Sequence, residues 1–337
     1  MATTLADEQV RAALTAIETE DASPGEKAEM LMEIAMGLQQ QPKTPQQIHD
    51  AIGLYERALA LCSEDDGILH ARLQARMGTA LQAVPEEGSD SLHAARAAFE
   101  SALEGLREGG LPEEIGEIQM NLGLVQQALA GFGQARITDA IAHYQKALQT
   151  FSRERNPKEF AILHNNLATA FLSIPFSDQR AKMREALAVQ SFEEGLKVVD
   201  PIDHPVEYAM LQNNLGNALQ YASSSHAVEN NLRALEAYDE ALKVRRPDSM
   251  PLEYANTIAN KANCLRNLPD APAEPALGNR GNLMLAIGLY GEAHSIFERH
   301  GETAKALVVA EALDEIEAEL AALPRNGAGD TSATAQA

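Results

Sequence analysis

The sequence has few aromatic residues and few cysteines. Phe, Tyr and Trp together make up 4% of its 337 residues, and Trp is absent. A β-sandwich relies on aromatic and β-branched residues, so this composition, which is rich in Ala and Leu, favours closely packed helices. Cys62 and Cys264 are the only cysteines, and no C-x-x-C pair occurs. This spacing argues against a disulfide framework and against a thiolate zinc site.

Basic side chains are also in the minority. The chain has 27 Lys and Arg residues and 49 Asp and Glu residues, so its formal net charge is −22. Such a chain repels phosphate backbones and anionic lipid head groups, and neither nucleic acid nor a membrane surface is expected as a partner. The sequence has no apolar run of about twenty residues that could span a membrane, and residues 1–20 lack the apolar core of a signal peptide. We therefore expect a cytoplasmic protein.

What the sequence does contain is an internal repeat. Three clear copies begin at Pro157, Pro205 and Pro251, each with Pro-x-Glu-aromatic-Ala. Weaker copies begin at Pro112 and Pro24, and a further copy over residues 73–81 lacks the leading Pro-x-Glu. Each copy has an anchor residue that is followed by Gly or Ala, and successive anchors are 43 to 48 residues apart. The anchors are Ile34, Met77, Leu122, Leu167, Leu215 and Lys261.

Each copy has a second half with its own apolar stripe. Ala51, Tyr55 and Ala58 set the pattern, and the steps of four and three residues place all three on one side of a helix. The same Ala-x-x-x-aromatic-x-x-small pattern starts again at Ala95, Ala140, Ala188, Ala234 and Ala286. Proline in the first turn and Glu two residues later suit the start of the first helix. A single helix pair cannot bury its stripe alone, so the pairs must stack on one another.

A Leu-Gly or Leu-Ala pair followed by Ala-x-x-x-Tyr/Phe-x-x-Ala resembles the tetratricopeptide repeat. The period of about 45 residues is similar to that of the longer bacterial tetratricopeptide proteins and of kinesin light chains. The resemblance implies an all-α fold, a right-handed α-solenoid of about six helix-turn-helix repeats. The expected repeats span residues 24–62, 66–108, 112–152, 157–200, 205–246 and 251–299.

We expect these repeats to form one superhelical domain over residues 1–323. Its ends are residues 4–20 and 302–323, which are amphipathic and are predicted to be the capping helices that a solenoid needs. Residues 324–337 have little to bury and are predicted to be a disordered tail.

In the tetratricopeptide family the first helices of successive repeats line a concave groove. The resemblance therefore implies a partner-binding groove in which polar side chains close to each anchor contact the partner. These residues are Asn121, Asn165, Asn166, Asn213, Asn214, Asn217, Gln220, Asn260, Lys261, Asn263 and Arg266. A side-chain amide both donates and accepts hydrogen bonds, so a row of amides suits the backbone of an extended peptide.

Three alternatives remain open for this row of amides. The Asn side chains contact a ligand, or they bond neighbouring helices and set the repeat geometry, or they are incidental surface residues. Lys261 and Arg266 would give the groove a positive end that suits an acidic group or a C-terminal carboxylate. The carboxylate clamp of the family is not reproduced, because its Lys positions hold Asn165, Asn213 and Ala259 here.

The sequence has no catalytic signature. The nine histidines are scattered, none lies in an H-E-x-x-H pair, and neither a Gly-rich phosphate loop nor a G-x-S-x-G elbow occurs. We therefore expect no enzyme activity, cofactor or metal. The predicted function is a bacterial scaffold or adaptor that binds a protein or peptide client, for instance as an assembly factor. A structural protein that oligomerises through its outer faces and a ligand-sensing regulator are the alternatives.

Overall fold

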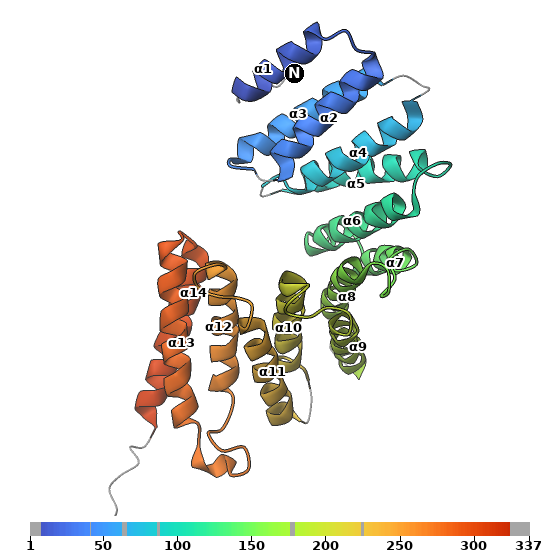
Figure 1. Ribbon diagram of the computed structural model, residues 1–337. Helices are drawn as coiled ribbons and strands as arrows, with labels where there is room; N and C mark the ends of the chain where they lie inside the picture. Colours follow the sequence, from blue (N-terminus) through green and yellow to red (C-terminus); the bar gives the residue numbers. More distant parts are fainter. Residues whose placement is uncertain are drawn as a thin grey trace, which may run out of the picture. The chain divides into compact units, whose positions relative to one another are not determined.

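The computed structural model describes residues 8–40, 42–62, 66–85, 88–175, 179–223 and 226–323, and these residues form helices without any strand (Figure 1). They divide into two compact units, Met1–Pro175 and Phe176–Ala337. The first unit contains α1 (Glu8–Thr19), α2 (Pro24–Gln40), α3 (Pro45–Leu61), α4 (Gly67–Gln82), α5 (Asp90–Gly105), α6 (Pro112–Gly131), α7 (Ile137–Ala147) and α8 (Pro157–Leu172). The second contains α9 (Gln179–Leu196), α10 (Pro205–Gln220), α11 (Ala227–Leu242), α12 (Pro251–Arg266), the short 3₁₀ helix η2 (Pro275–Leu277), α13 (Arg280–Arg299) and α14 (Thr303–Ala322).

Within each unit, every helix packs against the helices before and after it in the chain. The tightest pairs are α2 with α3, α4 with α5 and α6 with α7 in the first unit, and α10 with α11 and α12 with α13 in the second. These are the first and second helices of the predicted repeats. The stacking of successive pairs confirms the predicted all-α class and its α-solenoid architecture.

Both predicted capping segments contain helices, α1 at one end and α14 at the other. Residues 1–7, the start of the predicted N-terminal cap, lie outside the described residues, as does the predicted tail at 324–337. The single domain over residues 1–323 stays a prediction. The two helices of the fourth predicted repeat, α8 and α9, belong to different compact units.

The helices begin where the Pro-x-Glu motif predicts. A proline starts each of α6, α8, α10 and α12. Its lack of an N–H costs no hydrogen bond there, because N–H groups in the first helical turn have no partner within the helix. In α6 the Glu of the motif caps the helix, because the Leu111 amide donates to Glu114 Oε2 at 2.9 Å. The motif therefore positions the first residue of each of these helices.

The small residue after each anchor lets the two helices of a repeat approach closely. It is buried in all six repeats: Ala35, Gly78, Gly123, Ala168, Gly216 and Ala262. The aromatic residue of each second helix is buried as well: Tyr55, Phe99, Tyr144, Phe192, Tyr238 and Tyr290. A Cβ atom on Gly78 would lie 2.8 Å from the Phe99 ring, and one on Gly216 would lie 2.6 Å from the Tyr238 ring. The ring of the second helix thus occupies the space that a larger side chain would need.

The buried tyrosines of three repeats donate their hydroxyl to the first helix of the same repeat. Tyr55 donates to Gln39 at 2.8 Å and Tyr144 donates to Gln127 at 3.0 Å. Tyr238 donates to Gln220 at 2.9 Å. Each of these glutamines lies five residues after the anchor. The bond satisfies a polar group that burial would otherwise leave without a partner.

We predict that Gly216→Ala destabilises the second unit, by about 1–3 kcal/mol, because the added methyl overpacks the Tyr238 ring. The matched control is Gly288→Ala in α13, where a Cβ would meet nothing within 4 Å. The control should stabilise the chain by about 0.5–1 kcal/mol, the usual gain in helix propensity. Urea unfolding followed by circular dichroism measures both changes. Equal effects of the two substitutions would contradict the close approach of α10 and α11.

The buried tyrosines also predict a loss of stability at alkaline pH. Burial raises the pKa of Tyr55, Tyr144 and Tyr238 above the ordinary value, and it raises the pKa of Tyr290 to about 12. The unfolded chain therefore releases these protons first, and stability falls as the pH rises above about 10, the ordinary tyrosine pKa. Urea unfolding at several pH values measures the slope, which should flatten in Tyr238→Phe. An unchanged slope in that variant would show that Tyr238 does not titrate on unfolding.

Candidate partner-binding surfaces

The predicted groove residues lie on first helices in both units. Asn121, on α6, is half-buried and lines a small hollow between α4 and α6. Asn165 and Asn166 lie on α8 and are 7% and 8% exposed. The other predicted residues all lie on the first helices α10 and α12. They are Asn213, Asn214, Asn217, Gln220, Asn260, Lys261, Asn263 and Arg266. We call the amide-bearing members of this set the amide row.

On α8, the side-chain amides of Asn165 and Asn166 form one hydrogen bond with each other. Asn165 Nδ2 donates to Asn166 Oδ1 at 3.3 Å. Asn166 Nδ2 is buried and has no hydrogen-bond partner among the described residues. An unsatisfied buried donor costs about 1–3 kcal/mol, so it needs an explanation in a folded protein. A ligand or a water molecule would supply one.

The same pair recurs on α10 and there extends to the next repeat. Asn213 Nδ2 donates to Asn214 Oδ1 at 3.2 Å, and Asn260 Nδ2 of α12 donates to Asn213 Oδ1 at 3.3 Å. These bonds join the first helices of two successive repeats, as the geometric alternative predicts. The side-chain oxygen of Asn260, Oδ1, has no hydrogen bond to the described residues, so an acceptor remains for a ligand.

Asn217 and Gln220 serve the packing of their own repeat. Both side-chain oxygens accept from the Tyr238 hydroxyl, at 2.7 Å and 2.9 Å. Gln220 Nε2 is buried and has no partner among the described residues. The oxygen atoms of these two amides are therefore used by the fold, and their nitrogen atoms are the donors that are left.

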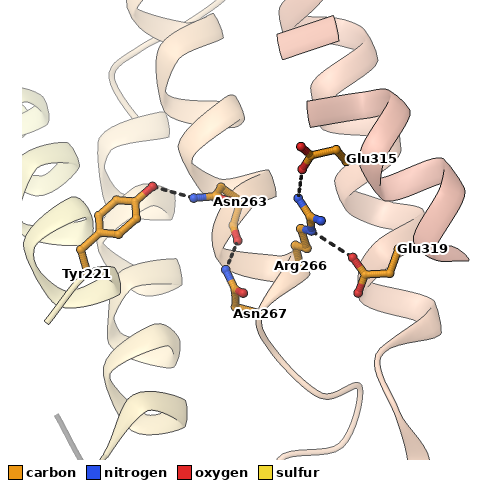
Figure 2. Close-up of polar contacts among 6 residues, drawn as sticks. All are labelled: Tyr221, Asn263, Arg266, Asn267, Glu315 and Glu319. Atoms are coloured by element: carbon orange, nitrogen blue, oxygen red, sulfur yellow. Dashed lines mark hydrogen bonds and ion pairs between the residues drawn. The ribbon is translucent and has the colours of Figure 1, made fainter. Parts of the chain in front are cut away.

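Asn263 joins the end of α10 to α12. Its Nδ2 donates to the Tyr221 hydroxyl at 2.6 Å, and Asn267 Nδ2 donates to the Asn263 backbone carbonyl at 2.9 Å (Figure 2). The Tyr221 side chain is 68% exposed, although it is large and aromatic. An exposed aromatic ring beside side-chain amides is the kind of surface that protein partners contact.

The two predicted cations are paired within the chain. Lys261 Nζ forms an ion pair with Asp239 of α11. Arg266 donates to Glu315 at 2.9 Å and to Glu319 at 3.0 Å, and both carboxylates belong to α14 (Figure 2). The hydrogen bond to Glu315, with that to Glu319, raises the pKa of the Arg266 guanidinium. The closing helix thus supplies the acidic groups that the sequence led us to expect from a partner.

The structure adds two residues that the sequence analysis missed. Arg72 and Arg76, on α4, line the same hollow as Asn121, which has a volume of about 40 Å³. Arg76 directly precedes the anchor Met77, so it occupies the repeat position that holds Asn in later copies. This signal was present in the sequence. It was missed because this copy lacks the Pro-x-Glu motif that marks the others.

The described residues contain no group of three or more His, Cys, Asp or Glu side chains that could hold a metal ion. None of the described helices combines the length and the apolar character that crossing a membrane requires. Cys62 and Cys264 are both free. Burial raises the pKa of the Cys264 thiol to about 12, and this thiol donates to the Asn231 backbone carbonyl at 3.2 Å. It is therefore a packed thiol rather than a reactive one.

The helix pairs define the chain as a helical-repeat protein with a tetratricopeptide-like fold, and comparison with solved structures agrees. The apo form of RapI superposes with a TM-score of 0.54 and 16% identity, over 88% of this chain and 94% of RapI. A STAND signal-transduction ATPase with a tetratricopeptide-repeat sensor, from Pyrococcus horikoshii, gives 0.55 and 15%, over 90% of this chain. This chain spans 42% of that ATPase.

A third solved structure, BtubC from P. vanneervenii, has a TM-score of 0.43 and 15% identity, over 98% of this chain and 100% of BtubC. No protein-family model matches the sequence, and no curated protein matches it. At these identities the likeness shows the fold alone.

The contacts of Arg266 predict how firmly α14 is held. Arg266→Gln removes two partly exposed ion pairs, each worth about 0–1 kcal/mol. Backbone amides of α14 should then exchange with solvent up to about tenfold faster, while those of α10 stay unchanged. Hydrogen–deuterium exchange with mass spectrometry measures this.

The matched control for this prediction is Lys305→Gln, which removes the ion pair of Lys305 with Glu302 at the other end of α14. That control should change only the first turn of the helix. Unchanged exchange throughout α14 in Arg266→Gln would show that its apolar contacts alone hold it.

Proposed function

We propose that this chain is a non-enzymatic scaffold or adaptor that binds an extended segment of a client protein or peptide through its amide row. The observation that carries the proposal is the neutral polar surface of α10 and α12, where Asn263 contacts the exposed Tyr221 side chain and Asn260 keeps its side-chain oxygen unbonded. Side-chain amides donate to and accept from a peptide backbone, and an aromatic ring adds apolar contact. Asn166 Nδ2 and Gln220 Nε2 also lack a partner among the described residues, but both atoms are buried.

The charge distribution supports a backbone-reading surface. No Asp, Glu, Lys or Arg occurs between Tyr208 and Val228, which includes most of α10, although the whole chain has a net charge of −22. A neutral polar surface binds the peptide backbone without demanding charged side chains from the client. Each backbone hydrogen bond contributes only about 1 kcal/mol, so several amides have to act together.

Two further classes of function remain as alternatives. The first alternative is a ligand-sensing regulator, because the STAND ATPase, which has a similar fold, contains a tetratricopeptide-repeat sensor. A structural protein that forms homo-oligomers is favoured by the outer face of α14, where Leu307 and Val308 are 61% and 65% exposed.

We place the chain in the cytoplasm because its two cysteines are free and its charge suits no membrane surface.

The proposal predicts that Asn166→Ala, Asn214→Ala and Asn260→Ala together abolish peptide binding. The probe is a synthetic pool of acetylated, amidated octapeptides, each position randomised over Ala, Asn, Asp, Gln, Leu and Tyr. Peptides that are retained with the full chain on a filter are identified by mass spectrometry. The triple variant should retain none of them, while its helicity is unchanged and its melting temperature falls slightly.

The matched control is the double variant Gln145→Ala and Gln190→Ala, which removes exposed amides from the second helices α7 and α9. This control should retain the same peptides as the unmodified chain. Equal retention by the triple variant would overturn the role of the amide row. If no peptide is retained at all and light scattering shows a stable oligomer, the structural alternative is favoured.

A further inference from the structure

The last three helices of the second unit, α12, α13 and α14, pack in succession (Figure 1). We propose that they form one block that opens and closes against α10 and α11 at a polar joint, and that a bound client holds this block closed. The opening itself follows from the packing of the second unit, whereas the effect of a client rests on the proposed function. We call residues 251–322 the terminal block.

The terminal block has an apolar core of its own. Every buried member of its apolar cluster lies within residues 255–316, on α12, α13 or α14. Leu235 and Leu242 of α11 contact this cluster only as partly buried side chains. By contrast, a cluster in the first unit includes Tyr144 of α7 and Leu163 of α8, which belong to successive repeats. The buried apolar packing of the terminal block therefore ends at α12.

Polar side chains occupy core positions at the joint before α12. Two positions recur where one repeat meets the next: four residues after the last small residue of the second-helix stripe, and four residues before the next anchor. At three earlier joints both positions hold buried apolar side chains, none more than 6% exposed. These pairs are Leu106 with Ile118, Phe151 with Leu163, and Val199 with Leu211. At the joint before α12 the two positions hold Arg245 and Thr257, which are 9% and 0% exposed.

The burial of Arg245 is only partly compensated. Its Nη1 donates to Thr257 Oγ1 at 2.8 Å, but the buried Nε has no hydrogen-bond partner among the described residues. Burial lowers the pKa of the Arg245 guanidinium, and the charge of Glu253 offsets only part of this effect. A buried charge regains hydration when its surroundings open, whereas a buried apolar side chain loses its favourable burial. Opening therefore costs less free energy at this joint than at the apolar joints before it.

Further polar contacts cross the same joint. Lys261 stands at the anchor position, where earlier repeats have an apolar residue, and it forms an ion pair with an aspartate of α11. Asn260 donates to Asn213 at 3.3 Å, and Asn263 donates to the Tyr221 hydroxyl at 2.6 Å. Partly exposed polar contacts of this kind are replaced by contacts with water at little cost. The joint therefore closes in a specific register but opens easily.

The position of the joint connects it to client binding. The amides of α10 lie on one side of the joint and those of α12 lie on the other, so opening divides the surface that we propose for the client. An extended segment that contacts both helices binds fully only to the closed form. Because it binds one form better than the other, such a client shifts the equilibrium toward the closed block.

Hydrogen–deuterium exchange of the full chain tests the opening. The most protected amides of α12, α13 and α14 should share one protection factor, lower than that of α10 and α11, because they open in one step. Arg245→Met together with Thr257→Val replaces the polar pair by apolar side chains of similar shape. This double variant should slow exchange about tenfold in all three helices together. Unchanged or faster exchange in the double variant would overturn the proposal.

Two further variants control this test. Thr257→Val alone leaves the Arg245 guanidinium without its acceptor, so it should speed exchange of the whole terminal block. Arg246→Met removes the same charge from the neighbouring, exposed side chain and should leave exchange unchanged. Fraying from the end of the chain predicts instead that protection falls in steps from α12 to α14, and this pattern would also overturn the proposal.

The octapeptide pool tests the effect of a client. Peptides retained by the unmodified chain should slow exchange throughout the terminal block, and they should slow it less in the double variant, whose block is already closed. Retained peptides that leave the exchange of α12, α13 and α14 unchanged would overturn the coupling and leave the amide row standing. Retention of no peptide would overturn the proposed function, while exchange in the variants still decides whether the block opens.

Discussion

The contact between the small residue after each anchor and the aromatic ring of the following helix controls the geometry of this protein. At Gly216 the backbone lies so close to the Tyr238 ring that there is no room for a methyl group. The same close approach occurs at Gly78 with Phe99 and at Gly123 with Tyr144, and the remaining repeats hold a buried Ala at this position, so a small residue allows the two helices of a pair to lie close together. The surfaces that we propose for binding lie on the helices that these rings hold in place.

The tyrosine hydroxyls connect this packing to the amide row. Asn217 and Gln220 accept from Tyr238, and so the packing of α11 against α10 decides which amide atoms remain for a partner. The bond from Asn260 to Asn213 has a similar role between repeats. The two interpretations of the row are therefore compatible, since one atom of an amide can set repeat geometry while another binds a ligand.

Contacts between helices also decide which charged side chains are paired within the chain. The acidic closing helix α14 supplies Glu315 and Glu319 to Arg266, which removes the positive end that the sequence suggested at the last repeat (Figure 2).

The sequence by itself determined the repeat, the helix pairs and the first residue of many helices, because apolar periodicity and the Pro-x-Glu motif are local signals. It also placed the amide row on the first helices. Only the tertiary structure decided which of those side chains are used internally, because the bonds from Tyr238 to Gln220 and from Arg266 to Glu319 join residues far apart in the chain. The pairing of Lys261 with Asp239 was decided in the same way, because it depends on which side chain the neighbouring helix α11 places beside the lysine.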